Sequence, residues 1–466
     1  MNEHIKKALE QTSDHYIYEA SVYNRARLPR RYAVIAAVLA VAILIGSFIP
    51  WQHMPFVGQF VPLATPVYPK MVPYSGVGAS HEKWMDCIRE QYDQPEGYAD
   101  SLDTFFTESI AQFLGEADMD NAVCSPVNLY MALALLAECA EGESRQQILN
   151  LMELNSIEEL RVQAGHVWNA HYRDDKLVKL LMANSLWLDN GFRYRQETAD
   201  ILASNYYATA YRTDLGGTIG NQMLRSWLNK ETGGLLKDQT AALELDPGTV
   251  LALASTIQYK VDWMEKFKES DNKEDTFYGA VKNTRVTYMK QTAEFDYYWS
   301  EKFTAVTLPL KDGSKMWLIL PDRGFTPETL LEERIALKMA MGSMENVEVE
   351  RANIRVIMPK FDIYSEADMV STVQKLGVTD IFSPASANFQ GICPGESGLY
   401  INKITHNTRL NVDEYGVIGV AYTVSNGLMG GPPSPDMRFT LNRPFLFVIT
   451  SLNGLPLFTG VVNSLD

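Results

Sequence analysis

The chain has 466 residues, of which 46% are hydrophobic, so it has enough material for one large domain or for a few average ones. Its formal net charge of −16 argues against a nucleic-acid backbone as partner, because such binding needs clustered lysines and arginines. No basic stripe occurs outside the N-terminal tail, so we expect no nucleic acid among the partners.

The N-terminus contains one apolar stretch. Residues 33–49 carry no charge and are preceded by Arg25, Arg27, Arg30 and Arg31. Such a stretch is just long enough to span a membrane, and arginines before it place its N-terminal side in the cytoplasm. We therefore predict a cytoplasmic tail over 1–31, a transmembrane anchor over 32–49 and the remaining chain outside, as a single-pass protein of the plasma membrane. The alternative is a cleaved signal, which would leave the protein secreted.

Prolines dominate the segment after this stretch. Six of them lie within residues 50–73. That density is incompatible with a helix or a central strand, so we predict an extended spacer outside the membrane over residues 50–97. The run HEKWMDCIRE inside it fits a short helix. His81-Glu82 lacks the second histidine of a zinc-protease helix.

Residues 98–466 have the pattern of one globular domain. Apolar residues recur at helical spacing in YADSLDTFFTESIAQFL, and SPVNLYMALALLAECA predicts a buried helix capped by Ser125 with Pro126 in its first turn. The run GESRQQILNLM comes next. Strand patterns follow in LLMANSLWLD, TVLALASTIQYKVDW, FTAVTLPL, KMWLILP, ENVEVERANIRVIMPKF, LYINKITHNTRLNVDE, RPFLFVITS and LPLFTGVVN. Helices gather early and strands late, which predicts an α+β fold with large, mainly antiparallel sheets and no internal repeat.

A stretch near the C-terminus combines two patterns. Residues 417–424 are uncharged and rich in β-branched side chains, as in a buried strand. They run into Gly430-Gly431-Pro432-Pro433, which cannot continue a sheet. The stretch is therefore either a strand with a long hairpin loop or a loop that can become a strand.

The sequence contains few signals of catalysis or metal binding. The chain lacks a GxSxG elbow, a P-loop and a GxGxxG after a strand, and its seven histidines show no metal-ligand spacing. Its four cysteines, Cys87, Cys124, Cys139 and Cys393, form no CxxC, and Cys124 and Cys139 lie in apolar runs typical of packed thiols. We expect no metal, no cofactor and no enzymatic activity, although a Ser-His-Asp triad with members far apart in the chain stays open.

Five motifs follow one another along residues 98–466. They are NAVCSPVNLYMALALLAECAEGESRQQIL, STIQYKVDW, MPKFDIYSEADMVSTVQKLGVTDIFSPASANFQGI, LYINKITHNTRLNVDEYG, and the closing pair NRPFLFVI and LPLFTGVV. Each is similar to a motif of the serpins, serine-protease inhibitors that work by changing shape, and their order is also that of the family. The resemblance implies the serpin fold for residues 98–466, in which helices pack on large sheets and a reactive-centre loop is exposed.

The resemblance also implies a mechanism for the ambiguous stretch. In serpins this segment is a mobile loop in the active state and a central strand of the main sheet after cleavage. The protein would act as a suicide substrate: a serine protease forms an acyl-enzyme with the loop, which then inserts and carries the protease with it. The absence of charge over residues 417–424 fits this, because no ion would lose its hydration on insertion.

Six residues take positions in the hinge of the family's loop: Glu414, Gly416, Val417, Gly419, Ala421 and Thr423, of which all but Gly419 match its pattern. Val417 takes the position that enters the sheet first, and Val417, Gly419, Ala421 and Thr423 share one face of any strand they form. The departures are Tyr415, Ile418, Gly419 and Tyr422, where the family has an acid, an acid, alanine and alanine. Gly419 weakens a strand, and Tyr422 is bulky, although it lies on the other face.

Two further sets match the parts of the fold where the sheet opens. Ser125, Asn128, Ser255 and His406 match the shutter, a polar cluster under the sheet, with Ser255 in place of asparagine and Asn128 in place of serine. Trp263 matches a tryptophan of the breach, where the loop enters. Without the resemblance, all five would be interpreted as ordinary core residues.

Family spacing from Glu414 places the reactive bond between Gly430 and Gly431, with Leu428 or Met429 as alternative acyl donors. None of these is basic, so the expected partner is a serine protease of elastase-like or subtilisin-like specificity. We expect a monomer bound to a membrane through its N-terminal helix, from a bacterial surface. The alternatives are a non-inhibitory serpin that acts as a binding module, and an extracytoplasmic hydrolase.

Overall fold

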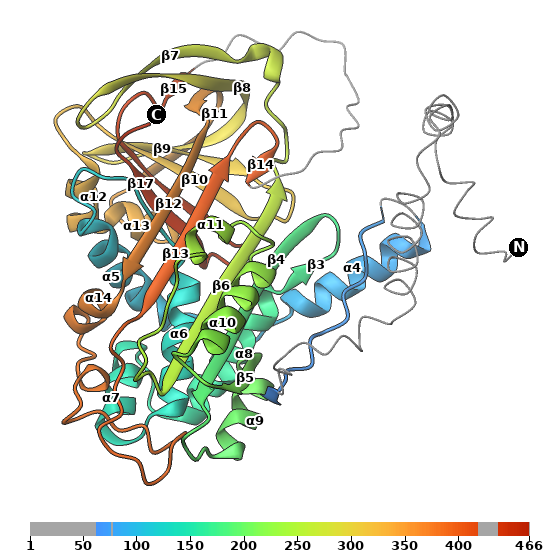
Figure 1. Cartoon of the computed structure of the whole chain (residues 1–466). Coiled ribbons are helices and arrows are strands. Elements are labelled where there is room, and N and C mark those ends of the chain that lie inside the picture. Colours follow the sequence, from blue (N-terminus) through green and yellow to red (C-terminus); the bar gives the residue numbers. More distant parts are fainter. Residues whose placement is uncertain (1–61, 76–77, 418–436, 466) are drawn as a thin grey trace, which may run out of the picture. The chain divides into compact units, whose positions relative to one another are not determined.

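Two large mixed sheets organise the molecule (Figure 1). The computed structural model describes residues 62–75, 78–417 and 437–465. The main sheet is eight-stranded, and all its neighbouring strands are antiparallel except β4 and β5. In spatial order its strands are β1 (Pro62–Ala64), β5 (Ala208–Thr213), β4 (Val178–Asp189), β6 (Leu251–Asp262), β14 (Gly416–Val417), β13 (Thr405–Val412) and β12 (Phe361–Asp368), with β3 (Arg173–Asp174) paired to β4.

The second sheet is nine-stranded and contains the most apolar strands of the chain. Its order is β15 (Met437–Thr440), β11 (Glu348–Pro359), β8 (Asn283–Trp299), β9 (Phe303–Pro309), β10 (Lys315–Pro321), β16 (Phe445–Thr450), β17 (Pro456–Val462) and β2 (Ala122–Cys124), with β7 (Lys273–Tyr278) paired to β8. Every residue of β16 and β17 is buried, as expected for strands covered on both faces.

The helices pack mainly around one buried helix, α6 (Pro126–Cys139). Every residue of α6 except Ala132 is buried, and α6 contacts both β6 and β17. Its start was predictable, because Ser125 accepts a hydrogen bond from the Asn128 backbone N–H and Pro126 occupies the first turn. The other helices are α4 (Ala79–Tyr92), α5 (Leu102–Gly115), α7 (Gly142–Leu151), α8 (Ile157–His171), α9 (Gln196–Asn205), α10 (Thr218–Glu231), α11 (Lys237–Thr240), α12 (Pro327–Glu333), α13 (Ile335–Ala340) and α14 (Val370–Lys375).

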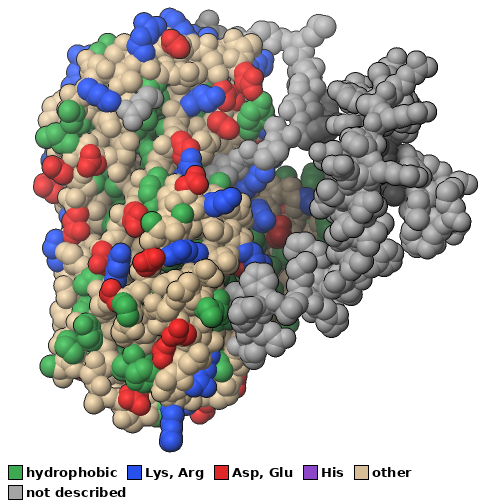
Figure 2. All heavy atoms as spheres, viewed as in Figure 1, with side chains coloured by type: hydrophobic (Ala, Val, Ile, Leu, Met, Phe, Trp, Pro, Cys, Tyr) green, Lys and Arg blue, Asp and Glu red, His purple; other side chains and the backbone are tan. Residues whose placement is uncertain are grey.

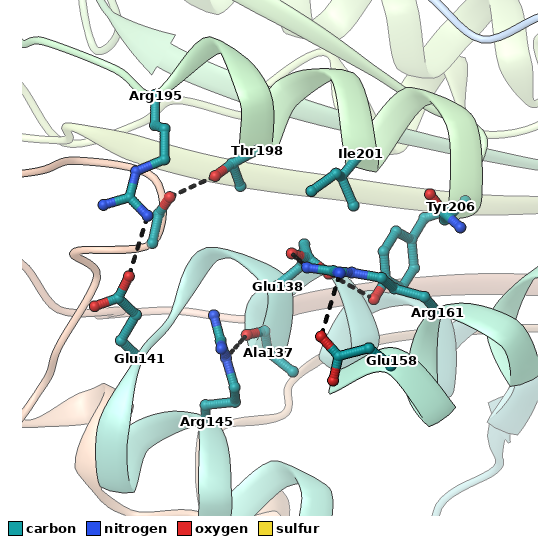
Figure 3. A network of polar contacts seen from close by, with 12 residues as sticks. Ala137, Glu138, Glu141, Arg145, Glu158, Arg161, Arg195, Thr198, Ile201 and Tyr206 are labelled. Atoms are coloured by element: carbon teal, nitrogen blue, oxygen red, sulfur yellow. Dashed lines mark hydrogen bonds and ion pairs between the residues drawn. The ribbon is translucent and has the colours of Figure 1, made fainter. Parts of the chain in front are cut away.

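An ion pair fixes α6 to its neighbours (Figure 3). Glu138 is buried on α6, and Arg161 of α8 binds both of its carboxylate oxygens at 2.9 and 2.8 Å. The hydroxyl of Tyr206, at the end of α9, donates to the same carboxylate at 3.0 Å. A buried carboxylate is tolerable only when it is paired in this way, so the contact fixes how the three helices meet.

The predicted spacer is wrong for much of its length. Within residues 50–97, β1 pairs with β5 at the edge of the main sheet, and Tyr68 stacks on Trp168 and Tyr172 at 5.6 and 5.5 Å between ring centroids. The expected short helix is α4, and its Trp84 indole donates to the buried Asp175 at 2.8 Å. The prolines permit an extended path but do not prevent it from packing, and the aromatic side chains hold this segment on the domain.

The predicted tail over 1–31 and anchor over 32–49 lie outside the described residues. Among the helices that the structure describes, none combines the length and the apolar character needed to cross a bilayer.

Candidate functional site

Two residues of the predicted hinge, Gly416 and Val417, belong to the main sheet as strand β14. Val417 lies opposite Val261 of β6 on one side and opposite Val412 of β13 on the other. Its side chain is 0% exposed. The residue that was expected to enter the sheet first is therefore buried in it, although the strand β14 consists of only two residues.

The described strands of the main sheet leave a gap next to β14. Within the part of the chain that the structure describes, β6 and β13 form no backbone pair with each other, and β14 alone joins them. A cavity of about 150 Å³ lies further along, lined by residues 251–256 of β6, by 401–407 and by side chains of α6 and α10. Facing strand edges without a partner are a template for another strand. We call the gap between β6 and β13 next to β14 the slot.

Gly416 is required by close packing. A Cβ on Gly416 would lie 2.1 Å from the carbonyl oxygen of Val261 and 2.7 Å from the Cα of Asp262. Both neighbours are backbone atoms of β6, so they cannot move aside as a side chain could. The hinge glycine predicted from the sequence thus has a physical reason, which is the approach of two backbones rather than an unusual turn.

Glu414 is buried and anchors the turn before β14. Its carboxylate binds Lys360 Nζ at 3.0 Å and accepts a hydrogen bond from the amide of Asn272. Burial by itself would raise the pKa of Glu414, but these partners outweigh it and hold the pKa below its usual value. A charged Glu414 therefore ties the turn before β14 to Lys360, between β11 and β12, and to Asn272, directly before β7.

Trp263 holds the same turn from the other side. Its indole N–H donates to the carbonyl oxygen of Asp413 at 2.8 Å. Its backbone N–H donates to the carbonyl oxygen of Tyr415 at 3.0 Å. Asp413 in turn accepts hydrogen bonds from the N–H groups of Tyr415 and Gly416. The predicted breach residue is fully buried and fixes the geometry with which the chain enters β14.

His406 is a residue of β13, and its side chain lies beside the start of α6. Its Nε2 accepts a hydrogen bond from the backbone N–H of Ser125 at 3.1 Å and is therefore unprotonated. The Thr408 hydroxyl, whose Oγ1 lies 2.9 Å from the same Nε2, must then be the donor in that contact. Burial lowers the pKa of His406 to about 4, because no anion compensates the lost hydration of an imidazolium. His406 is therefore neutral at physiological pH and acts as an acceptor.

Asn128 and Ser255 form a second polar group, which joins α6 to β6. The Asn128 amide donates to the backbone oxygen of Ser255 at 3.0 Å, and Ser255 Oγ lies 2.5 Å from Asn128 Oδ1 and 2.7 Å from Asn184 Oδ1. The single hydroxyl proton serves one of these two acceptors at a time. The predicted shutter residues thus form two neighbouring groups, Ser125 with His406 and Asn128 with Ser255, that line one end of α6.

The structure adds partners that the sequence analysis missed. Asn184 interrupts an apolar strand in LLMANSLWLD, a signal that could have identified it, because a buried amide needs a partner. Thr408, Asp413 and Lys360 carried no such signal. The predicted loop residues Gly419, Ala421, Thr423, Leu428, Met429, Gly430 and Gly431 lie outside the described residues.

The cysteines are free thiols. Cys124, Cys139 and Cys393 are buried and Cys87 is partly exposed, so the prediction of packed thiols for Cys124 and Cys139 is confirmed. Burial raises the pKa of Cys393 to about 12 and moves that of Cys139 in the same direction. These thiols are therefore protonated and unreactive at neutral pH.

Comparisons with known proteins agree with the motif order. A family model described as serpin (serine protease inhibitor) matches residues 101–465. A mouse protein named leukocyte elastase inhibitor A is 24% identical over 364 residues, covering 75% of this chain and 94% of its own. The native structure of the thermophilic serpin tengpin has a TM-score of 0.72 at 24% identity and covers 88% of this chain and all of that one. Human thyroxine-binding globulin, solved with thyroxine, has a TM-score of 0.69 at 19% identity and covers 80% and 99%.

Proposed function

Because the chain belongs to the serpin family, we propose that it inhibits serine proteases as a suicide substrate whose loop becomes a strand of the main sheet. One observation carries the proposal: Val417 is buried between β6 and β13 at the head of the slot. A loop that starts inside the sheet needs no further search for its insertion site, because each following residue can pair next to the last.

The register of β14 defines where the loop would go. Continued from the pairs of Val417, it would set Thr423 between Ser255 and His406. Since residues two apart share a face, Thr423 would lie on the same face of the sheet as Val417, the face on which Ser255 contacts Asn128 of α6. Its hydroxyl would then meet the polar groups of Asn128 and Ser125, which would satisfy it as the sheet closes.

Insertion would be driven by two gains. Each backbone hydrogen bond added to β6 or β13 contributes about 1 kcal/mol net, and the loop face that includes Val417 buries apolar surface. The uncharged stretch 417–424 loses no ionic hydration on entry. The native fold therefore stores free energy that cleavage of the loop releases.

The chemistry would come from the protease. Its serine oxygen attacks the carbonyl carbon of Gly430, forming an ester, and the amine of Gly431 leaves with the proton that the catalytic histidine took from the serine. Insertion then drags the ester-linked protease across the molecule and deforms its oxyanion hole, so that water no longer completes the hydrolysis. The apolar residues at this bond suit an elastase-like or subtilisin-like protease, and one relative is itself named as an inhibitor of leukocyte elastase.

We further propose that this monomeric domain faces outward from a bacterial plasma membrane, tethered by residues 32–49. The support is the arginine cluster before that apolar stretch. Protease added to intact cells should then reach the domain, and complete protection in sealed cells would contradict this orientation.

A second function remains, that of a serpin that binds a ligand without trapping proteases. The substitutions Tyr415, Ile418, Gly419 and Tyr422 favour it, because they depart from the hinge pattern of efficient inhibitors. Incubation with a panel of serine proteases separates the two. A complex that survives SDS and has the summed mass of protease and inhibitor supports inhibition, whereas cleavage without any complex supports the binding module.

A further inference from the structure

Three basic side chains lie close together on an exposed face of the second sheet. Arg355 of β11 lies directly opposite Arg438 of β15 in a parallel pair. On the other side of β11, Ile357 lies opposite Lys290 of β8, one step along the same face. All three basic side chains are exposed. We call Lys290, Arg355 and Arg438 the basic face.

These cations have no anionic partner among the described residues, since none of the three forms an ion pair there. The Nε of Arg355 lies 3.4 Å from the Thr292 hydroxyl and the Nε of Arg438 lies 3.3 Å from that of Thr440, so their remaining guanidinium N–H groups stay available. Like charges directly opposite in a sheet destabilise it. This placement is unfavourable unless an anion binds.

The surroundings make the face a hollow rather than a flat surface. Side chains of β7, β8, β11 and β15 line a hollow of about 350 Å³, and Lys273, Asp271 and Asp275 also line it. Elsewhere, on the side shown in Figure 2, acidic and basic side chains are interspersed and apolar ones are scattered. The chain as a whole has a net charge of −16, whereas four cations and two carboxylates line this hollow, so its local charge has the opposite sign.

The position of the face identifies its occupant. Strand β15 begins at Met437, directly after the segment that contains the proposed reactive bond. Arg438 lies eight positions after Gly430 in the sequence, which limits their distance to about 28 Å even in a fully extended chain. A protease domain of ordinary size has a radius of about 20 Å. Its body must therefore pass over or beside the basic face while it holds the loop.

We propose that the basic face docks an acidic surface patch of the target protease and selects among enzymes of the same cleavage specificity. This proposal rests on the proposed function for the identity of the partner. Complementary charge raises the rate of association more than the final affinity, so the face would speed the encounter that precedes cleavage. The loop would then set which bond is cut, and the basic face which protease arrives.

The test uses two subtilisin-like proteases of similar specificity, one with a low and one with a high isoelectric point, each with its catalytic serine replaced by alanine. Their association with the full chain is followed by surface plasmon resonance at low and high salt. We expect the Arg355→Glu, Arg438→Glu double variant to associate about tenfold more slowly with the acidic protease at low salt, and the difference to disappear at high salt. Arg355→Gln, Arg438→Gln should show a smaller loss, and thermal unfolding confirms that both variants are folded.

A matched control changes net charge equally elsewhere: Lys83→Glu, Lys338→Glu alters exposed side chains of α4 and α13. Equal slowing by the control and by the double variant overturns the proposal, as does equal association of wild type with both proteases or with neither. Active proteases keep the two hypotheses apart. If no SDS-stable complex forms while the inert acidic protease still binds through Arg355 and Arg438, the proposed inhibition fails and the docking face stands.

Discussion

Val417 and Val261 lie opposite each other in an antiparallel pair, and this contact places the start of the proposed reactive loop inside the main sheet. On its other side Val417 faces Val412, so one small side chain closes the top of the slot between β6 and β13. The residue is fully buried, and the strand it belongs to has only one other member, Gly416. Changes at these two positions should therefore affect function more than their size suggests.

Val417→Arg should convert the inhibitor into a substrate. The guanidinium would have to stay in an apolar position without a partner, at a cost of several kcal/mol, so insertion would slow and deacylation would win. The measurement is the number of inhibitor molecules consumed per protease trapped, read on a denaturing gel. Val417→Thr keeps the branched shape without charge and is the control. If the arginine variant traps protease as well as wild type, the insertion model is wrong.

Gly416→Ala should expel β14 from the sheet, because the added methyl would overlap the backbone of β6 at 2.1 Å. We expect faster hydrogen exchange at Val417 and a loss of about 1–3 kcal/mol in the free energy of unfolding. Gly248→Ala is the control, since a Cβ there meets nothing within 4 Å. Unchanged exchange at Val417 would show that the close approach is not a constraint.

Stability should fall as the pH drops from about 6.5 to about 4, in part because of His406. Its folded pKa of about 4 lies below the ordinary value of about 6.5, so in this range the unfolded chain binds more protons than the native one. The expected loss is about 3 kcal/mol, complete near pH 4 and absent above pH 7. Urea unfolding of wild type and His406→Gln across this range measures it.

The comparison with His406→Gln is needed because His171 is also buried with a lowered pKa and acts in the same direction. Glu414 enters only at lower pH, since its pKa is held below the ordinary carboxyl value. If wild type and His406→Gln lose stability in parallel between pH 6.5 and 4.5, His406 is not the group responsible.

Trp84→Phe should destabilise the domain, because the bond from the indole to the buried Asp175 is lost. A reduction of about 1–2 kcal/mol in the free energy of unfolding is expected. Met85→Leu, at an exposed neighbouring position of α4, is the control. A neutral Trp84→Phe would instead suit the extended spacer that the prolines alone suggested.

Cleavage in the stable complex should fall between Leu428 and Gly431, and trypsin should be trapped poorly, because its pocket carries a carboxylate that these residues leave unpaired. The mass of the released C-terminal fragment identifies the bond. A fragment that begins at Phe439, after Arg438, would contradict both the reactive bond and the target class.

Local pattern predicted much of this fold. Helix α6 was expected from its continuous apolar run with Ser125 and Pro126 at the start, and strands such as β16 and β17 from their unbroken apolar sequence. In these elements the residues that form the structure are neighbours in the chain, so propensity, capping and burial all act within one segment. The family motifs rest on the same kind of segment, and the hinge and shutter roles that they imply stay predictions.

Strand β8 was not predicted as one, because it has 17 residues with charges on the exposed positions and no simple alternation. Helices α8, α9 and α10 were missed for a related reason, since their apolar faces are short and mixed with polar residues. The contacts of β8 with β7, β9 and β11 stabilise it from outside.

The sequence by itself determined which segments are apolar enough to be core, where α6 begins, and that residues 417–424 can enter a sheet without desolvating a charge. Only the tertiary structure decided that Val417 is already buried, that Gly416 must lack a side chain, that Lys360 and Asn272 hold Glu414, and that residues 62–75 pack on the domain. The reason is distance along the chain. Each of these contacts joins residues far apart in sequence, and their free energy depends on backbone approach and burial that exist only once the two sheets have formed.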